Sequence, residues 1–221
     1  MQRITHMPDK PFPPLIPTRL TGKEPLHIDG NPLPHTLLDF WQWSVSDLVS
    51  NVTRGRLAEF IVATALGIDV SGVRSEWDPF DLTMPPPSCL KIEVKSAALI
   101  QSWFQARHSK ITWRTPATRA WDFQTNRLAE EARRQADVYV FALLHHPDQE
   151  TIDPMNTAQW SFFALATRVL DERKRSQHSI TLPSLEGIAG PPVGYAGLLA
   201  AVKGAGEKQR QTAKDAPPGH L

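Results

Sequence analysis

The chain has 221 residues, of which 41% are hydrophobic, so it is long enough to bury the core of one soluble domain. Its formal net charge of +1 excludes the strongly basic composition that marks many nucleic-acid-binding domains. The single cysteine, Cys89, excludes a disulfide framework, and no apolar run is long enough to span a bilayer. We therefore expect a cytoplasmic protein without a membrane partner.

Three zones follow one another along the chain. Residues 1–35 hold eight of the 20 prolines and show no sustained periodicity, which predicts a Pro-rich extended arm. Residues 36–205 carry helical and strand patterns in turn and are expected to form a single domain. Residues 206–221 are largely polar and contain a Pro-Pro-Gly run near their end, which predicts a flexible, disordered tail.

Two helices are expected at the start of the domain. Residues 35–52 are rich in Leu, Phe and Trp, and such a helix should pack on a sheet. The next helix runs from Arg54 to Leu66, with Gly67 as its C-terminal stop. Its Glu59 lies on an apolar stripe, and a carboxylate buried there needs a partner.

A β-hairpin follows these helices. The runs 80–84 and 90–96 both alternate with a period of two, and a proline-rich connection separates them. In the second run the apolar residues point to one face, whereas Glu93 and Lys95 point to the other. If the two strands pair, Asp81 of the first strand joins Glu93 and Lys95 on the polar face.

The rest of the chain predicts a mixed β-sheet flanked by helices, with a short helix or irregular link at 97–107. Residues 137–144 are apolar, β-branched and aromatic, which favours a central strand. Further strands are expected at 110–114, 160–166 and 180–182. Further helices are expected at 125–134, from the end of the 160–166 strand through Arg173, and at 195–203, where Gly204 should end the last one.

Two carboxylates and an ammonium group on one patch suit hydrolysis assisted by a divalent metal. Mg²⁺ takes one or two carboxylates and completes its shell with water and substrate phosphate. A nearby lysine can orient or deprotonate the attacking water. The pattern therefore indicates Asp81, Glu93 and Lys95 as a candidate hydrolytic centre.

Asp81 followed by Glu93-Val94-Lys95 resembles the D…ExK signature of the PD-(D/E)XK nuclease superfamily, in which a preceding helix often adds an acidic residue, here Glu59. The resemblance implies a restriction-endonuclease-like core and a metal-dependent DNA endonuclease. It also implies that Asp81 and Glu93 hold Mg²⁺, or Mn²⁺ in its place, with the Val94 carbonyl as a third protein ligand. Lys95 would position the hydrolytic water, and Glu59 would bind a second metal or a metal-bound water.

The sequence departs from the superfamily pattern at one position. The proline of the signature usually precedes the aspartate directly, whereas here Phe80 separates Pro79 from Asp81. Asp78 therefore competes for the metal role. We expect Asp81 to serve, because it lies inside the strand and in phase with Glu93, while Asp78 falls in the turn before it.

The segment after the hairpin has the local charge of a nucleic-acid surface. No acidic residue occurs from Val94 through Trp121, and basic residues alternate there with aromatic ones. Such a surface neutralises phosphates and offers rings for stacking. The residues expected to contact nucleic acid are Arg107, Lys110, Arg114 and Arg119, together with Gln101, which lies where the superfamily resemblance places a glutamine near metal or DNA.

Two other functions fit the same sequence. A nucleic-acid-binding or assembly protein could retain the nuclease fold without cutting, and a structural subunit could use the arm and the tryptophans at a protein interface. The intact Asp81, Glu93 and Lys95 favour catalysis. A homodimer would suit an enzyme that cuts both strands of a duplex.

Overall fold

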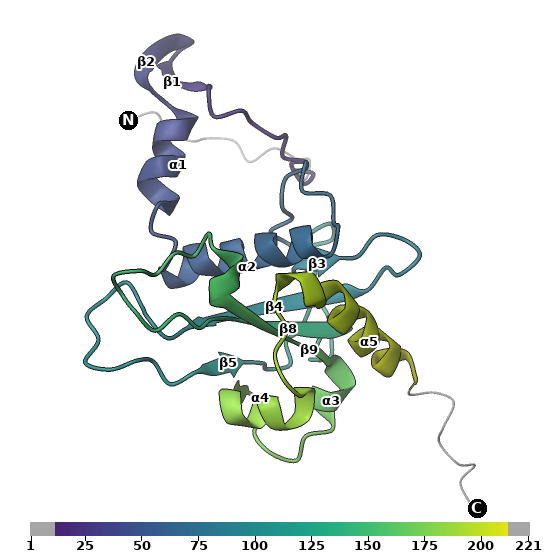
Figure 1. The fold of residues 1–221 in the computed structure, drawn as a ribbon. Helices are drawn as coiled ribbons and strands as arrows, with labels where there is room; N and C mark the ends of the chain where they lie inside the picture. The colour runs from purple at the N-terminus through teal and green to yellow at the C-terminus, as the bar shows by residue number, and fades with distance from the viewer. Residues whose placement is uncertain (1–11, 212–221) are drawn as a thin grey trace, which may run out of the picture.

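In the computed structural model, which describes residues 12–211, a four-stranded mixed sheet lies at the centre (Figure 1). Its strands, in spatial order, are β3 (Leu82–Thr83), β4 (Lys91–Ala98), β8 (Val138–Leu144) and β9 (Trp160–Ala166). β4 and β8 run parallel, whereas the two outer pairs are antiparallel. The central mixed sheet that the sequence predicts is therefore confirmed.

β8 is the central strand, as its composition indicates, because all seven of its residues are buried. It pairs with β4 on one side and with β9 on the other. A strand that is covered on both faces has no polar face to present, which explains its continuous apolar run.

Helices cover both faces of this sheet. α2 (Asn51–Ala65) and α5 (Leu198–Arg210) pack on one face. The opposite face is covered by α3 (Thr167–Asp171), α4 (Leu182–Ala189), β5 (Thr112–Arg114) and β10 (Ser179–Thr181). Gly67 ends the Glu59 helix with a positive φ of 69°, as the sequence predicts.

All of the predicted strands are present, although two of them lie outside the central sheet. The strands expected at 110–114, 160–166 and 180–182 correspond to β5, β9 and β10. β5 pairs with β10 and not with the central sheet. The link after β4 is irregular and contains no helix up to β5. Two 3₁₀ turns complete the order, η1 (Thr157–Gln159) and η2 (Tyr195–Gly197).

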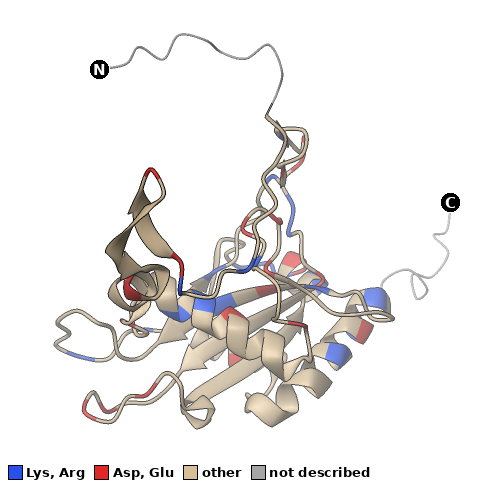
Figure 2. Ribbon diagram, turned by 90° about the horizontal axis from the view of Figure 1, so that it is seen from above, with Lys and Arg blue, Asp and Glu red and all other residues tan. Residues whose placement is uncertain are grey.

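The prediction of a simple extended arm over residues 1–35 is wrong for its last third. β1 (Pro25–Ile28) and β2 (Asn31–Thr36) form an antiparallel hairpin, whose turn has positive φ at Asp29 and Gly30. This hairpin stands away from the sheet in Figure 1, and Figure 2 shows it without charged residues except at its acidic turn. Residues 1–11 of the predicted arm lie outside the described part of the chain.

The helix expected at 35–52 forms over α1 (Leu37–Val45), but it does not pack on the sheet. A capping box between Thr36 and Asp39 starts it, and none of its residues is buried. Trp43 is 85% exposed. The apolar side chains of this helix therefore lie outside the core.

The prediction of a helix at residues 125–134 is also wrong. β6 (Trp121–Asp122) and β7 (Arg127–Leu128) pair there as a small hairpin. The Asp122 carboxylate accepts hydrogen bonds from both the amide and the hydroxyl of Thr125. Local side-chain bonds of this kind satisfy backbone groups outside a helix, so the chain turns back on itself.

The last helix is longer than the sequence indicates. Gly204 lies inside α5 and does not stop it, and residues 206–210 are helical where a disordered tail was expected. Val202 and Ala205 of this helix are buried against the sheet, and such packing outweighs the low helix propensity of glycine. Residues 212–221 of the predicted tail lie outside the described part of the chain. Across residues 12–211, no helix combines the length and apolarity required to cross a bilayer.

Candidate active site

The predicted hairpin is present, but its first strand, β3, is only two residues long, and Asp81 lies just before it and not inside it as expected. Asp81 is nevertheless held against the edge of β4. The Asp81 N–H donates to the Ile92 carbonyl at 3.0 Å, and the Asp81 Oδ2 accepts from the Val94 N–H at 2.8 Å. A strand residue directs its N–H and its C=O to the same neighbour, so the Val94 carbonyl leaves β4 on the Asp81 side. The Asp81 side chain is 18% exposed, so solvent still reaches it.

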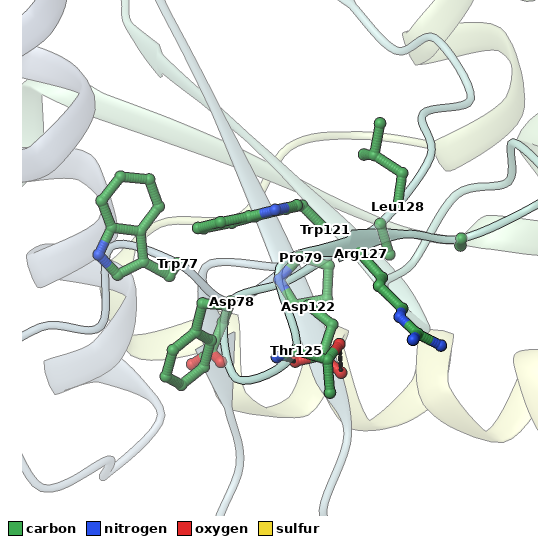
Figure 3. A pocket seen from close by; sticks show the side chains of 11 residues that line it. Trp77, Asp78, Pro79, Trp121, Asp122, Thr125, Arg127 and Leu128 are labelled. Carbon is green, nitrogen blue, oxygen red and sulfur yellow. Dashed lines mark hydrogen bonds between the residues drawn. The ribbon is translucent and has the colours of Figure 1, made fainter. Parts of the chain in front are cut away.

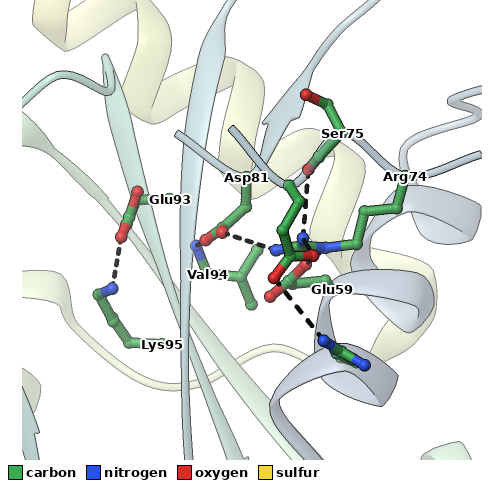
Figure 4. Close-up of polar contacts among 9 residues, drawn as sticks. Glu59, Arg74, Ser75, Asp81, Glu93, Val94 and Lys95 are labelled. Carbon is green, nitrogen blue, oxygen red and sulfur yellow. Dashed lines mark hydrogen bonds and ion pairs between the residues drawn. The ribbon is translucent and has the colours of Figure 1, made fainter. Parts of the chain in front are cut away.

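Glu93 and Lys95 lie beside this edge, on the face of β4 opposite to α2. In the parallel register they are partnered by Tyr139 and Phe141 of β8, which belong to the core cluster on that face. Their side chains form an ion pair. In Figure 4 this pair lies on one side of Asp81, and Glu59 lies on the other.

Arg74 is a site residue that sequence reasoning missed. Its guanidinium binds the Glu59 carboxylate through Nε, and its Nη2 lies 3.5 Å from Asp81 Oδ1 (Figure 4). Nη1 donates to Glu76 at 2.7 Å. Glu59 is half-buried, and the partner expected for it is therefore Arg74. Arg74 lies in the irregular segment between α2 and β3, where no periodicity distinguishes it.

The carboxylates of this site repel one another. Burial raises the pKa of Glu93 above its ordinary value, the negative charge of Asp81 raises it further, and Lys95 opposes both effects. Burial likewise raises the pKa of Glu59, against the hydrogen bond from Arg74. A cation near Asp81 and Glu93 would relieve this repulsion.

The donor set fits a hard divalent cation. The carboxylates of Asp81 and Glu93 and the Val94 carbonyl are oxygen ligands of the kind that Mg²⁺ and Mn²⁺ take. Within residues 12–211, no three Asp, Glu, His or Cys side chains are grouped as a ready-made metal site. Magnesium needs only one or two carboxylates, so Asp81 and Glu93 are sufficient in number. Each of the three carboxylates has a cationic partner, which is Arg74 for Asp81 and Glu59 and Lys95 for Glu93.

Two cavities lie along the loop before β3 and share Asp78. One, of about 380 Å³, is lined by Glu59, Arg74, Asp78 and Asp81 among others. The other, of about 470 Å³, is aromatic and is shown in Figure 3. Trp77 and Trp121 meet there edge to face, with ring centroids 5.2 Å apart.

Asp78 and Asp81 differ in how they are held. Asp78 lines both cavities, is exposed, and makes no side-chain hydrogen bond within residues 12–211. Asp81 is bonded to the backbone of the ExK strand. The structure therefore fixes Asp81, and not Asp78, against β4, the strand that carries Glu93 and Lys95.

The five residues expected to contact nucleic acid separate into two groups. Gln101, Lys110 and Arg114 line a cavity of about 400 Å³ that Lys95 also lines, whereas Arg107 and Arg119 do not. Gln101 is 8% exposed, and its amide bonds to Arg54, Ala98 and Ser109. Its side chain therefore supports this cavity from within and does not extend from the surface.

The chain was also compared with known proteins. The family model described as bacteriophage T4 endonuclease IV matches residues 36–183, which are about two thirds of the chain. The match includes every residue of the candidate site described above. No curated protein matches the chain.

Proposed function

The chain belongs to the bacteriophage T4 endonuclease IV family, and we propose that it is a metal-dependent DNA endonuclease whose active centre consists of Asp81, Glu93 and Lys95. The observation that carries this proposal is the bond between Asp81 and the Val94 N–H. It holds the aspartate against the middle residue of the ExK tripeptide, which supports the PD-(D/E)XK resemblance. We assign the core to the restriction-endonuclease-like fold on the same ground.

Each residue has a distinct part in this proposal. Asp81 and Glu93, with the Val94 carbonyl, would hold Mg²⁺ or Mn²⁺. The chemistry that such a cation supplies is neutralisation of the phosphate charge and activation of water. Lys95 donates hydrogen bonds to the attacking water and to the phosphate oxygens on which charge develops. Glu59, held by Arg74, orients water at the edge of the same centre.

The decisive experiment compares cleavage by the parent protein and by Lys95→Ala. Supercoiled plasmid, linear duplex, single-stranded DNA and RNA are incubated with each protein in Mg²⁺, in Mn²⁺ and in chelator. We expect the parent to cut DNA only with metal, and Lys95→Ala to cut at least about 100-fold more slowly. Oligonucleotide binding in chelator should change far less, because Lys95 acts mainly on the transition state.

Lys208→Ala is the matched control, because Lys208 is exposed in the last turn of α5. This variant should cut at the parental rate. A Lys95→Ala protein that cuts as fast as the parent would place the active centre elsewhere. Cutting in chelator would contradict metal dependence. A parent protein that binds DNA but cuts nothing would favour the binding or assembly protein.

A further inference from the structure

A cation-lined cavity of about 400 Å³ lies beside Lys95. The start of α2, the end of β4, the link that follows it and β5 contribute to its wall. Four of its lining residues are Arg54, Lys95, Lys110 and Arg114, and no Asp or Glu lines it. A concave site whose lining charges are all positive concentrates the electric field and attracts an anion.

Arg54 is the strongest reason to expect an anion there. The residue is 3% exposed, and its guanidinium donates only to neutral acceptors. These acceptors are Ser96 Oγ at 3.0 Å, the Val49 carbonyl at 2.8 Å, Gln101 Oε1 at 3.1 Å and Asn51 Oδ1 at 2.7 Å. Within residues 12–211 it has no ion pair with a carboxylate. Asp47 attracts the guanidinium electrostatically but forms no ion pair with it. A buried charge that no carboxylate contacts is unfavourable unless a ligand supplies the missing contact.

The other cations of the cavity are also available to a ligand. Lys110 and Arg114 are exposed and form no ion pair within the described chain. Trp113, which lines the cavity between them, is 2% exposed, and its indole N–H has no acceptor among the described residues. Lys95 is paired with Glu93, so one residue connects this cavity with the candidate catalytic centre.

We propose that the cavity lined by Arg54, Lys110 and Arg114 is a subsite for a backbone phosphate of the nucleic-acid strand, next to the phosphate that is hydrolysed at Lys95. The inference rests on the proposed function, because that function supplies the polyanion. A phosphate group suits the site, since its several oxygens can accept from arginine and lysine donors at once. The subsite would fix the register of the strand against Asp81 and Glu93.

The test is the salt dependence of oligonucleotide binding, measured by fluorescence anisotropy in chelator so that no cutting occurs. Lys110→Gln and Arg114→Gln are compared with the parent and with Lys208→Gln, whose side chain lies outside the cavity. We expect each cavity variant to lower the slope of log K against log salt by about 0.7 for a single strand or about 0.9 for a duplex. Lys208→Gln should keep the parental slope.

Arg54 is tested separately, because its replacement removes several buried hydrogen bonds. Arg54→Lys and Arg54→Gln are first checked for folding by circular dichroism and thermal melting. If folded, Arg54→Gln should show the same loss of slope, and Arg54→Lys a smaller one. If neither variant folds, the Lys110→Gln and Arg114→Gln slopes decide the question alone.

The outcomes separate this inference from the proposed function. A parent that binds and cuts, with unchanged slopes in both cavity variants, overturns the subsite and leaves the endonuclease intact. A parent that neither binds nor cuts overturns the proposed function. If inorganic phosphate raises the melting temperature of the parent while the slopes stay unchanged, the cavity takes free phosphate and the strand assignment is wrong.

Discussion

Asp78 and Asp81 lie close together in the sequence, but the fold surrounds them differently. Asp81 gains its position from the Val94 N–H, a backbone donor that cannot move away without breaking the edge of β4. Its other oxygen faces Arg74. Asp78 is exposed between two cavities and has no such bond within residues 12–211. A metal-binding carboxylate must be held in place before the cation arrives.

Asparagine at each position tests which aspartate serves. Asp81→Asn keeps an oxygen that can accept from Val94 but removes the charge, so we expect it to lose Mg²⁺-dependent cleavage by at least about 100-fold. Its metal affinity, measured by calorimetry, should fall in parallel. Asp78→Asn should fold and still cut. The reverse result would show that the strand register argued from Asp81 does not define the site.

Helix α5 shows how packing decides between two glycines of one element. A Cβ on Gly206 would lie 2.3 Å from Leu90 Cδ1, and Leu90 is itself buried in the core. A Cβ on Gly204 would meet no atom within 4 Å. Gly206 therefore allows the helix to approach the β3–β4 hairpin closely, whereas Gly204 serves no contact.

Alanine substitutions at these two glycines should have opposite effects on stability. Gly204→Ala should stabilise the protein by about 0.5–1 kcal/mol, because alanine has the higher helix propensity. Gly206→Ala should destabilise it, because overpacking costs about 1–3 kcal/mol and exceeds that gain. Chemical denaturation with urea measures both. Equal stabilisation by the two variants would mean that α5 does not pack on Leu90 as described.

At the scale of the whole molecule, charge is nearly balanced but unevenly placed. The net charge is +1, yet the carboxylates gather at the edge of β4 and the cations line the cavity beside Lys95. Folding must therefore hold Glu93 and Asp81 close together in the absence of a metal. The repulsion between these two carboxylates lowers the stability of the fold, although the proposed function needs both of them.

Glu93→Gln tests that opposition through the pH dependence of stability. The pKa of Glu93 is raised by burial and by Asp81, so its ionisation disfavours the folded state as pH rises through that raised pKa. Below the ordinary glutamate pKa the carboxyl is neutral in both states, and the effect vanishes. In chelator we expect Glu93→Gln to melt above the parent at pH 7.5, by about 2–4 °C per kcal/mol relieved, and level with it at pH 4. A parent that melts higher at pH 7.5 would show that the ion pair with Lys95 outweighs the repulsion.

Local pattern was sufficient for the elements that carry the candidate centre. The period of two in the hairpin placed Glu93 and Lys95 on one face of β4, and the structure confirms it. The helical composition before Gly67 located Glu59, and the apolar run at 137–144 located β8. These predictions succeed because alternation, helix stops and continuous apolarity are properties of neighbouring residues.

What the sequence by itself determined is thus the set of acidic and basic residues and the strands and helix that bear them. Only the tertiary structure decided that Arg74 is the partner of Glu59, that Arg54 is buried beside Ser96 without an ion pair, and that α1 stands away from the sheet. The physical reason is distance along the chain. Arg54 and Ser96 are separated by 42 positions, and no periodicity records a contact that forms when α2 packs against β4.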